Sequence, residues 1–242
     1  MFDHVTIRVS DRDASERFYT TVLATLGREP TYSAPELAEW GDFSLAAADP
    51  DHPVTQRLHI GFVAPSREHV DAFHAAGVAA GYRDDGAPGP RPQYTPDYYG
   101  SFLLDPDGNS AEAVHHEDVR EHGTIDHLWI RVADVAASRA FWETLAPEGG
   151  WRMHIHSRER VHVIGADGGS FTLVAGTPTE HVHLAFPAGD DAAVDAFHYA
   201  GLHAGYGDGG APGERPQYHP GYYGAYVIDP DGHNVELVNH NR

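Results

Sequence analysis

Two sets of three side chains, each with two histidines and one glutamate, recur along the chain at matched spacing. The first set is His4, His59 and Glu112, and the second is His127, His183 and Glu236. Successive members are 55 and 53 residues apart in the first set, and 56 and 53 in the second. Imidazole and carboxylate are ligands for divalent metal ions, and three of them leave positions open for a substrate. The spacing therefore predicts two metal sites capable of chemistry.

The two sets belong to an internal duplication. Arg-Pro-Gln-Tyr at 91–94 returns at 215–218, and Asp-Pro-Asp-Gly at 105–108 returns at 229–232. Aligning 84–116 with 208–240 leaves 20 of 33 positions identical, which chance does not explain. We predict a first domain at 1–116, a linker at 117–124 and a second domain at 125–242, each long enough to bury a core.

Composition argues against several classes of protein. The formal net charge is -20 and all 16 basic residues are arginine, so the chain offers no basic surface for nucleic acid or anionic membranes. Cysteine is absent, so a metal must be held by histidine and carboxylate, and the expected location is the cytoplasm. We expect no signal peptide, and no stretch reaches the roughly 20 apolar residues that span a bilayer.

Alternating polarity predicts strands whose polar face carries histidine. His4 alternates with Val5 and Ile7, and His59 alternates in the same way with its apolar neighbours. Helical spacing predicts helices at 11–26, 66–80, 135–144 and 190–203. Further strands are predicted at 37–40, 43–47, 58–63, 101–104, 110–114, 125–132, 153–164, 171–174, 181–186 and in a last pair ending at 238. The Gly- and Pro-rich segment 86–99 is predicted to be an ordered loop.

This arrangement resembles the vicinal oxygen chelate superfamily, which includes glyoxalase I, extradiol dioxygenases, fosfomycin-resistance transferases and bleomycin-resistance proteins. The resemblance rests on Asp-Pro-Asp-Gly-x-x-x-Glu at 105–112 and 229–236, and on the histidine near the start of each module's first strand. It implies an α+β fold of four βαβββ units that form two tandem cup-like domains, with the metal on the concave face. Related proteins exchange units between partners, so His4 is free to complete either the Glu112 or the Glu236 site.

The resemblance also implies a metal-dependent enzyme that acts on a small molecule, as a monomer or homodimer. We expect Fe(II), with Mn(II), Ni(II) or Zn(II) as alternatives, and predict a dioxygenase or oxygenase for an aromatic or vicinal-oxygen substrate. A glyoxalase-like lyase, an epimerase or a thiol transferase would keep the metal and change the reaction. Glyoxalase I usually has a fourth protein ligand, and 44–46 and 172–174 hold no glutamate where one is expected. A drug-binding protein without catalysis is the third interpretation.

The second copy carries two residues that suggest it is the more active one. Tyr226 lies ten residues before Glu236, as a tyrosine does in extradiol dioxygenases, and His219 lies seventeen before it. A phenol can donate to a developing oxyanion, and a histidine can move protons. The first copy has Phe102 and Thr95 at these places, so we predict catalytic roles for Tyr226 and His219 only.

Other polar residues have weaker assignments. Arg8 and Arg131 share strand parity with His4 and His127, which suggests that they hold an anionic group of the substrate. The duplicated tyrosines are predicted to line the cup and contact substrate, namely Tyr98 and Tyr222. Two further histidines of the first copy recur in the second, His74 as His198 and His116 as His240. We expect His74 and His198 to be exposed on helices, and His116 and His240 to lie at the rim of the sites.

Overall fold

The computed structural model describes residues 1–117, 120, 122–166 and 169–241, which group into two compact units. Unit 1 contains Met1–Val5 and Ile130–Arg242, and unit 2 contains Thr6–Trp129. The first residues of the chain therefore belong to the unit built mainly from the second sequence copy. The predicted linker at 117–124 lies partly outside the described residues, and the domain limits derived from the duplication stay a prediction.

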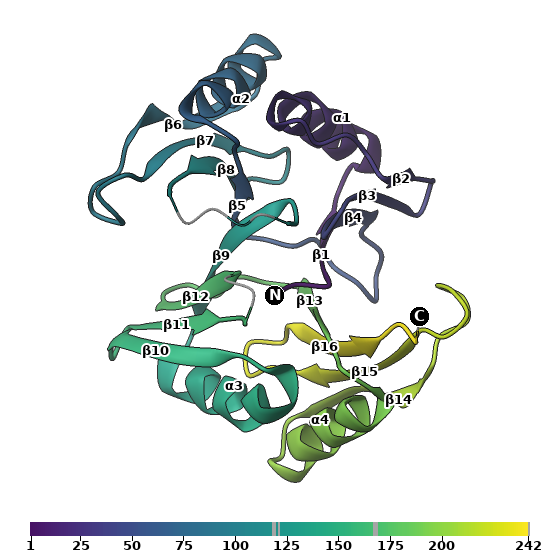
Figure 1. Cartoon of the computed structure of the whole chain (residues 1–242). Helices are drawn as coiled ribbons and strands as arrows, with labels where there is room; N and C mark the ends of the chain where they lie inside the picture. Colours follow the sequence, from purple (N-terminus) through teal and green to yellow (C-terminus); the bar gives the residue numbers. More distant parts are fainter. Residues whose placement is uncertain (118–119, 121, 167–168, 242) are drawn as a thin grey trace. The chain divides into compact units, whose positions relative to one another are not determined.

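Each sequence copy forms two modules of one strand, one helix and three strands (Figure 1). The first module comprises β1 (His4–Val9), α1 (Arg12–Leu23), a short 3-10 helix (Ala24–Leu26), β2 (Tyr32–Ser33), β3 (Leu37–Trp40) and β4 (Phe43–Ala47). The second comprises β5 (His59–Val63), α2 (Arg67–Ala79), β6 (Arg83–Pro90), β7 (Tyr99–Leu104) and β8 (Ser110–His115).

The second copy repeats this order. Its first module comprises β9 (Ile125–Val132), α3 (Val135–Gly149), β10 (Arg152–Ser157), β11 (Arg160–Ile164) and β12 (Ser170–Ala175). Its second comprises β13 (Val182–Pro187), α4 (Asp191–His203), β14 (Gly207–Glu214), β15 (Tyr223–Ile228) and β16 (Asn234–Asn239). The predicted α+β fold of four βαβββ modules is therefore confirmed.

The sheets place the strands that carry the ligand candidates next to one another. In unit 2, one set of neighbouring strands has the order β6-β7-β8-β5, with β9 up to Trp129 beside β5. The other set has the order β1-β4-β3-β2, with β1 from Thr6 onward. In unit 1, they run in the order β14-β15-β16-β13, with the start of β1 beside β13, and β10-β11-β12 adjoin the end of β9. The pairs β5 with β8 and β13 with β16 are parallel.

The helices cover one face of the sheets and leave the other face for polar side chains. In unit 2, α2 packs on β7 and β8, and in unit 1, α4 packs on β15 and β16 (Figure 1). Aromatic side chains fill the space beneath α3, where Trp142 lies 4.6 Å from Phe171 and 5.7 Å from Phe186 between ring centroids. Apolar side chains therefore alternate toward the helices, while histidine and glutamate alternate away from them.

Aspartates cap the N-terminal ends of three helices, α1, α3 and α4. The Asp11 carboxylate accepts a hydrogen bond from the N–H of Ala14, and the Asp134 carboxylate accepts from the N–H groups of Ala136 and Ala137. These caps satisfy backbone donors that the first turn of a helix leaves without a partner. They fix where each helix leaves the strand before it.

The segment predicted as a loop at 86–99 is partly a strand, so that prediction is wrong for its first residues. Strand β6 covers Arg83–Pro90, and β14 repeats it at Gly207–Glu214. Pairing of β6 with β7 is interrupted on both sides of Gly86. Both strands lie at the edge of a sheet, where a proline without an N–H group is tolerated. Irregular edge strands can thus contain the glycine and proline that suggested a loop.

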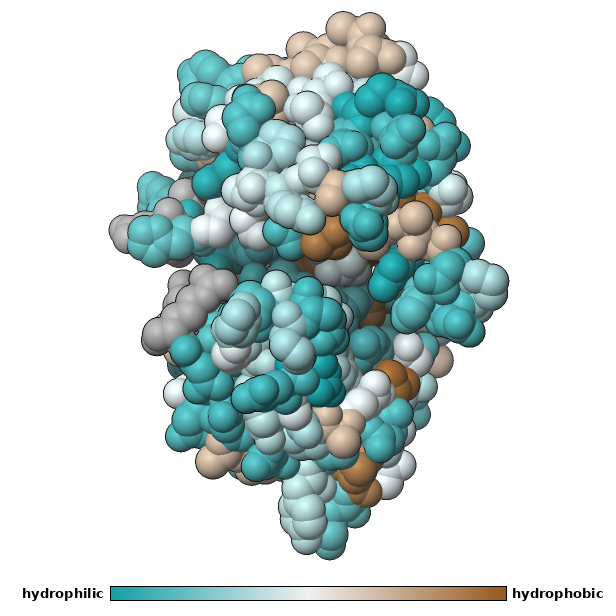
Figure 2. Space-filling view, turned by 90° about the vertical axis from the view of Figure 1, so that its right-hand side faces the viewer, coloured by the Kyte–Doolittle hydropathy of each residue, from teal (hydrophilic) through white to brown (hydrophobic). Residues whose placement is uncertain are grey.

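The face drawn in Figure 2 is mostly hydrophilic, with hydrophobic residues in small groups. This agrees with the formal net charge of -20. Among the described residues, no helix is both long and apolar enough to cross a membrane.

Candidate metal centres

The Glu112 site, formed by His59, Glu112 and His127, is set up by strand register in unit 2. Strands β9 and β5 pair His127 with Gly61, and β5 and β8 pair Gly61 with Glu112. His59 lies two residues before Gly61 and therefore points to the same face. A Cβ atom at position 61 would lie 2.5 Å from Cε1 of the His127 ring. Glycine at this position is what allows the imidazole to lie over β5 and reach Glu112.

Both imidazoles of the Glu112 site approach the same carboxylate oxygen. Oε2 of Glu112 lies 3.0 Å from Nε2 of His59 and 3.5 Å from Nε2 of His127. On the other side of its ring, His127 has Nδ1 2.8 Å from Oδ2 of Asp126. Oδ1 of Asp126 lies 3.2 Å from Nε2 of His116. An aspartate thus orients the histidine so that Nε2 faces the site.

The Glu236 site, formed by His4, His183 and Glu236, lies in unit 1. Nε2 of His183 is 3.1 Å from Oε2 of Glu236 and 3.1 Å from Nε2 of His4. Nε2 of His4 is 3.7 Å from Oε2 of Glu236. The N–H of Asp3 donates to the carbonyl of Ala185 at 2.9 Å, and Ala185 pairs with Glu236 in the register of β13 and β16. This contact holds His4 beside the two residues from the second copy.

The spacing of these atoms fits a metal ion. Two ligand atoms about 2.1 Å from an ion and at a right angle are about 3 Å apart. Five nitrogen–oxygen and nitrogen–nitrogen separations within the two sites run from 3.0 to 3.7 Å. Two imidazoles and one carboxylate on one side of an ion form the facial arrangement typical of non-haem Fe(II) sites, with open positions opposite. In each site the three residues therefore suit a divalent ion.

Two buried tyrosines fix the orientation of the glutamates. The Tyr98 hydroxyl donates to Oε1 of Glu112 at 2.8 Å, and the Tyr222 hydroxyl donates to Oε1 of Glu236 at 2.7 Å. Burial and the nearby carboxylate raise the pKa of both phenols, so they stay protonated donors. We predicted that these tyrosines contact substrate. They are 8% and 5% exposed with their hydroxyls bound to the glutamates, and contact with substrate stays a prediction.

Two groups of the Glu112 site have strongly shifted pKa values. Burial alone would raise the pKa of Glu112, but hydrogen bonds from His127 and His59 lower it to about 2. Burial alone would lower the pKa of His127, but its bonds to Asp126 and Glu112 raise it to about 10. Without metal, His127 therefore carries a proton at neutral pH, which an incoming ion must displace.

The histidine at the start of each copy joins the site of the other copy. His4 lies with His183 and Glu236, and His127 lies with His59 and Glu112. The sequence left open which glutamate His4 approaches, because the opening strands of both copies have the same pattern. The open question about His4 is answered by the position of β1 next to β13. That these six residues bind metal stays a prediction.

Tyr226 and its counterpart Phe102 mark the main difference between the sites. Tyr226 pairs with Glu236 in the register of β15 and β16, and its ring centroid lies 6.1 Å from that of His183. Burial and the charge of Glu236 raise the pKa of Tyr226, so it is a proton donor. Phe102 pairs with Glu112 and lies 5.9 Å from His59, again between ring centroids. One site has a phenol where the other has a phenyl ring.

His219, predicted to be catalytic, reaches the Glu236 site only through other side chains. Nδ1 of His4 lies 2.8 Å from Oδ1 of Asp3, and Oδ2 of Asp3 lies 2.7 Å from Nε2 of His240. Nδ1 of His240 lies 2.8 Å from Nε2 of His219. His219 is thus the outer end of a hydrogen-bonded chain that begins at His4. In the first copy, Thr95 stands in its place and donates to Asp97.

Two arginines that the sequence analysis did not assign lie over these aromatic rings. The guanidinium carbon of Arg215 is 5.5 Å from the Tyr226 ring centroid, and that of Arg91 is 5.4 Å from the Phe102 centroid. Arg215 donates to the carbonyl of Ala211 at 2.6 Å, which fixes its position. The signal was the repeated Arg-Pro-Gln-Tyr, which we used only as a mark of duplication.

The predicted arginines have other surroundings. The guanidinium of Arg8 donates to the carbonyl of Ala47 at 3.2 Å, and Arg131 is exposed beside Gly176. Their binding of substrate stays a prediction.

Of the helix histidines, His198 is only 8% exposed, so the prediction of exposure is wrong for it. Its Nε2 lies 3.0 Å from Oδ1 of Asp208 on β14, a strand that the sequence analysis missed.

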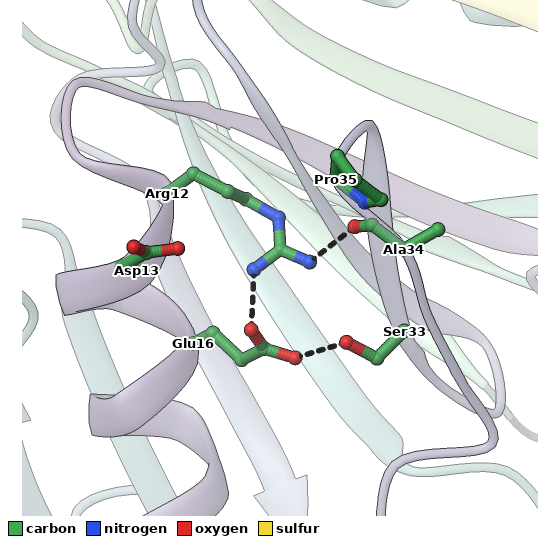
Figure 3. A pocket seen from close by; sticks show the side chains of 6 residues that line it. All are labelled: Arg12, Asp13, Glu16, Ser33, Ala34 and Pro35. Carbon is green, nitrogen blue, oxygen red and sulfur yellow. Dashed lines mark hydrogen bonds and ion pairs between the residues drawn. The ribbon is translucent and has the colours of Figure 1, made fainter.

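A hollow between α1 and β2 shares no residue with either triad (Figure 3). Arg12 donates to Glu16 at 2.9 Å and to the carbonyl of Ala34 at 3.1 Å. Ser33 donates to the second oxygen of Glu16 at 2.5 Å. Arg12 and Glu16, two of the three charged residues of this hollow, are thus bound to each other.

Residues 1–113 match the model of the Glyoxalase/Bleomycin resistance protein/Dioxygenase superfamily. The second copy repeats the motifs of the matched part, including Asp-Pro-Asp-Gly and the glutamate that follows it. The chain belongs to this superfamily. Its members are the vicinal oxygen chelate proteins that the sequence motifs resemble. A search of curated proteins found no match.

Solved structures share the fold of the whole chain. Glyoxalase I from Zea mays is 19% identical, over 99% of this chain and 92% of its own, with a TM-score of 0.72. A proposed dioxygenase from Bacillus subtilis subsp. subtilis strain 168 is 13% identical, over 100% of this chain and 85% of its own, with a TM-score of 0.66. A glyoxalase/bleomycin resistance protein from Albidiferax ferrireducens T118 is 36% identical over 48% of this chain and 99% of its own, with a TM-score of 0.44.

Proposed function

We propose that this vicinal oxygen chelate protein is a divalent-metal-dependent enzyme whose reactive ion is held by His4, His183 and Glu236. The observation that supports the proposal most is the approach of two Nε2 atoms and one Oε2 atom to within 3.1 to 3.7 Å of one another. The protonated phenol of Tyr226 lies beside these atoms. A site that only stabilises the fold would normally be closed by a fourth protein ligand.

The reaction we prefer is Fe(II)-dependent oxygenation of a small aromatic or vicinal-oxygen substrate. An ion bound there would act as a Lewis acid for two adjacent substrate oxygens, and as Fe(II) it would also supply an electron to dioxygen. Tyr226 is placed to donate a hydrogen bond to a substrate oxygen as negative charge develops on it. The glutamate supplies a single negative charge, which leaves the bound cation electrophilic.

Residues around the triad hold its members in place. Tyr222 keeps Oε1 of Glu236 occupied, so Oε2 faces the histidines. Asp3 binds Nδ1 of His4 and thereby favours the tautomer whose Nε2 lone pair faces the site. The guanidinium of Arg215 over the Tyr226 ring is a candidate for holding an anionic group of the substrate, in addition to the predicted Arg8 and Arg131.

His219 has a proposed role at a distance from the substrate. The chain from His4 through Asp3 and His240 to His219 consists of bonds of 2.7 to 2.8 Å. Such a chain can pass a proton between the edge of the site and the half-buried imidazole of His219, whose Nδ1 lies 2.8 Å from the carbonyl oxygen of Pro220. We therefore propose that His219 moves protons, and that Tyr226 is the catalytic residue that meets the substrate.

Metal content and reaction type can be tested together. The protein is purified without oxygen, its metals are measured, and Fe(II)-loaded protein is mixed with oxygen and a panel of catechols. Oxygen uptake with ring cleavage supports the proposal. Conversion of a glutathione hemithioacetal by protein loaded with Mn(II), Ni(II) or Zn(II), without oxygen uptake by the iron form, identifies the lyase instead. Failure to bind any divalent ion leaves the non-catalytic drug-binding protein as the answer.

A further inference from the structure

A third group of histidines, separate from the triad residues, lies on the hairpin formed by β10 and β11 in unit 1. His154 and His156 are two residues apart on β10, and the pairing with β11 is irregular at His156. The register of the hairpin places His154 directly opposite His162 on β11. Ring centroids are 4.6 Å apart for His154 and His156, and 5.8 Å apart for His156 and His162.

The two triads provide an internal scale for these distances. The ring centroids of His4 and His183 are 5.1 Å apart, and those of His59 and His127 are 5.4 Å apart. The hairpin histidines are therefore about as close as pairs whose nitrogens already converge on one point. His154 and His156 are exposed, and β10 lies at the edge of its sheet, so an ion can approach from solvent.

We propose that His154, His156 and His162 form a third metal site that binds Zn²⁺, Ni²⁺ or Cu²⁺. Donation by imidazole alone suits these borderline ions and excludes Mg²⁺ and Ca²⁺, which require oxygen ligands. The ring nitrogens of the three residues do not all lie within 4.8 Å of one another, as those of the triads do. Binding therefore includes a rotation of the exposed side chains of β10 about their own bonds.

The charges on the hairpin indicate how the metal affinity of this site compares with that of the two triads. Arg160 lies on β11, two residues before His162. The same arginine repels a cation, and the hairpin site has no carboxylate among its ligands. It should thus bind more weakly than either triad and fill last in a titration.

The first copy supplies a natural contrast. Phe43 in β4 corresponds to Phe171 in β12, so Ser44 corresponds to Thr172. Ser44 pairs with Glu39 and Thr172 pairs with His162, so Glu39 stands at the position of His162. Tyr32, which pairs with Glu39, stands at the position of His154. No histidine occupies these two places in the first copy, so the duplication itself does not account for the cluster.

The site is tested in the full chain with both triads disabled by Glu112→Ala and Glu236→Ala. We expect this double variant to bind one Ni²⁺ ion, at the hairpin, in a calorimetric titration. Adding His154→Ala and His156→Ala should abolish this binding. Absence of Ni²⁺ binding in the double variant, or equal binding in the quadruple variant, overturns the proposal. Neither outcome bears on the triads, so the proposed function is judged separately.

A second measurement does not depend on the buried glutamate changes. In the otherwise unaltered protein, His154→Ala with His156→Ala should reduce the Ni²⁺ stoichiometry by one and leave the Mn²⁺ stoichiometry unchanged, because Mn²⁺ prefers sites that include a carboxylate. Unchanged Ni²⁺ stoichiometry contradicts the assignment.

Discussion

The Glu236 and Glu112 sites share a ligand set and differ in the residues around it. In both, two histidines meet a buried glutamate whose second oxygen accepts a hydrogen bond from a tyrosine. Beside Glu236 lie Tyr226 and the chain that leads to His219, whereas Phe102 and Thr95 take these places in the first copy. The residues that would hold a metal are thus the same at both sites, while the phenol of Tyr226 and the imidazole of His219 occur at one only. Retaining a metal and using it are separate requirements.

The strands beneath the two sites also differ at one position. His127 lies over Gly61, which has no side chain to oppose it. The corresponding residue of β13 is Ala185, so His4 cannot take the same position over its strand. His127 is held between Asp126 and Glu112, and this raises its pKa to about 10. The Glu112 site therefore binds a proton tightly in the position where a metal would bind.

Removing either glutamate should have the largest effect. Glu236→Ala should abolish metal binding at its own site and remove most of the activity, because a three-ligand site with two ligands left holds an ion weakly. Glu112→Ala should halve the metal content and leave most of the turnover. Both are measured by metal analysis and steady-state rates. If both variants keep full stoichiometry, the triads are not metal sites; if Glu112→Ala alone abolishes turnover, the more active site has been misassigned.

Exchanging the phenol and phenyl groups tests the cause of the difference. Tyr226→Phe should lower kcat by about 10² to 10³, the usual effect of losing one donor to an oxyanion, with metal content unchanged. Phe102→Tyr is the matched control, and should not reduce turnover because it adds a phenol to the other site. An unchanged kcat in Tyr226→Phe would exclude the proposed role of this tyrosine.

The aspartates behind His4 and His127 should tune metal affinity. Asp3→Asn and Asp126→Asn each remove the charge that orients a ligand imidazole, and such changes typically weaken metal binding by about 10 to 100-fold. Competition with a fluorescent chelator measures each loss. Because Asp3 and Asp126 belong to different sites, each variant should affect one of two binding steps. A uniform loss at both steps would show that the variants act on the fold as a whole.

Metal binding at the Glu112 site should depend on pH. The folded pKa of His127, about 10, lies above its ordinary value of 6.5. Its proton therefore stabilises the metal-free fold fully below pH 6.5, and this contribution disappears as pH rises through about 10. An ion must displace that proton, so affinity should rise about tenfold per pH unit near neutrality. Titration of the Glu236→Ala variant with Mn²⁺ at pH 7 and pH 8 measures this, and equal affinities would contradict it.

Much of this molecule could be predicted from its sequence because local patterns set its elements. Alternation around His4 and His59 predicted the strands and the face that each histidine occupies, and strands were also predicted on both sides of the first Asp-Pro-Asp-Gly, at 101–104 and 110–114. Each turn is held by its first aspartate, as in Asp105, whose Oδ1 accepts from the N–H groups of Asp107 and Asn109. These are interactions between residues near one another in the chain, which sequence patterns record.

The remaining features depend on contacts between residues far apart in the sequence. Which glutamate His4 approaches is decided by the pairing of β1 with β13, and both opening strands have the same local pattern. The bonds from Tyr98 to Glu112 and from Tyr222 to Glu236 join residues on different elements, so no local pattern predicts them. Strand β6 was missed because its two irregularities with β7 remove the regular alternation of side chains.

The placement of the first five residues in unit 1 has a historical consequence. A half-length ancestor would have carried one opening histidine and one pair of His and Glu, the same inventory that each copy still has. If its opening strand crossed over as β1 does now, a lone ancestral chain could not assemble all three ligands, and only a pair of chains could. In the present chain each half supplies one histidine to the triad of the other half, so a half expressed alone could assemble three such residues only by pairing with a second copy of itself.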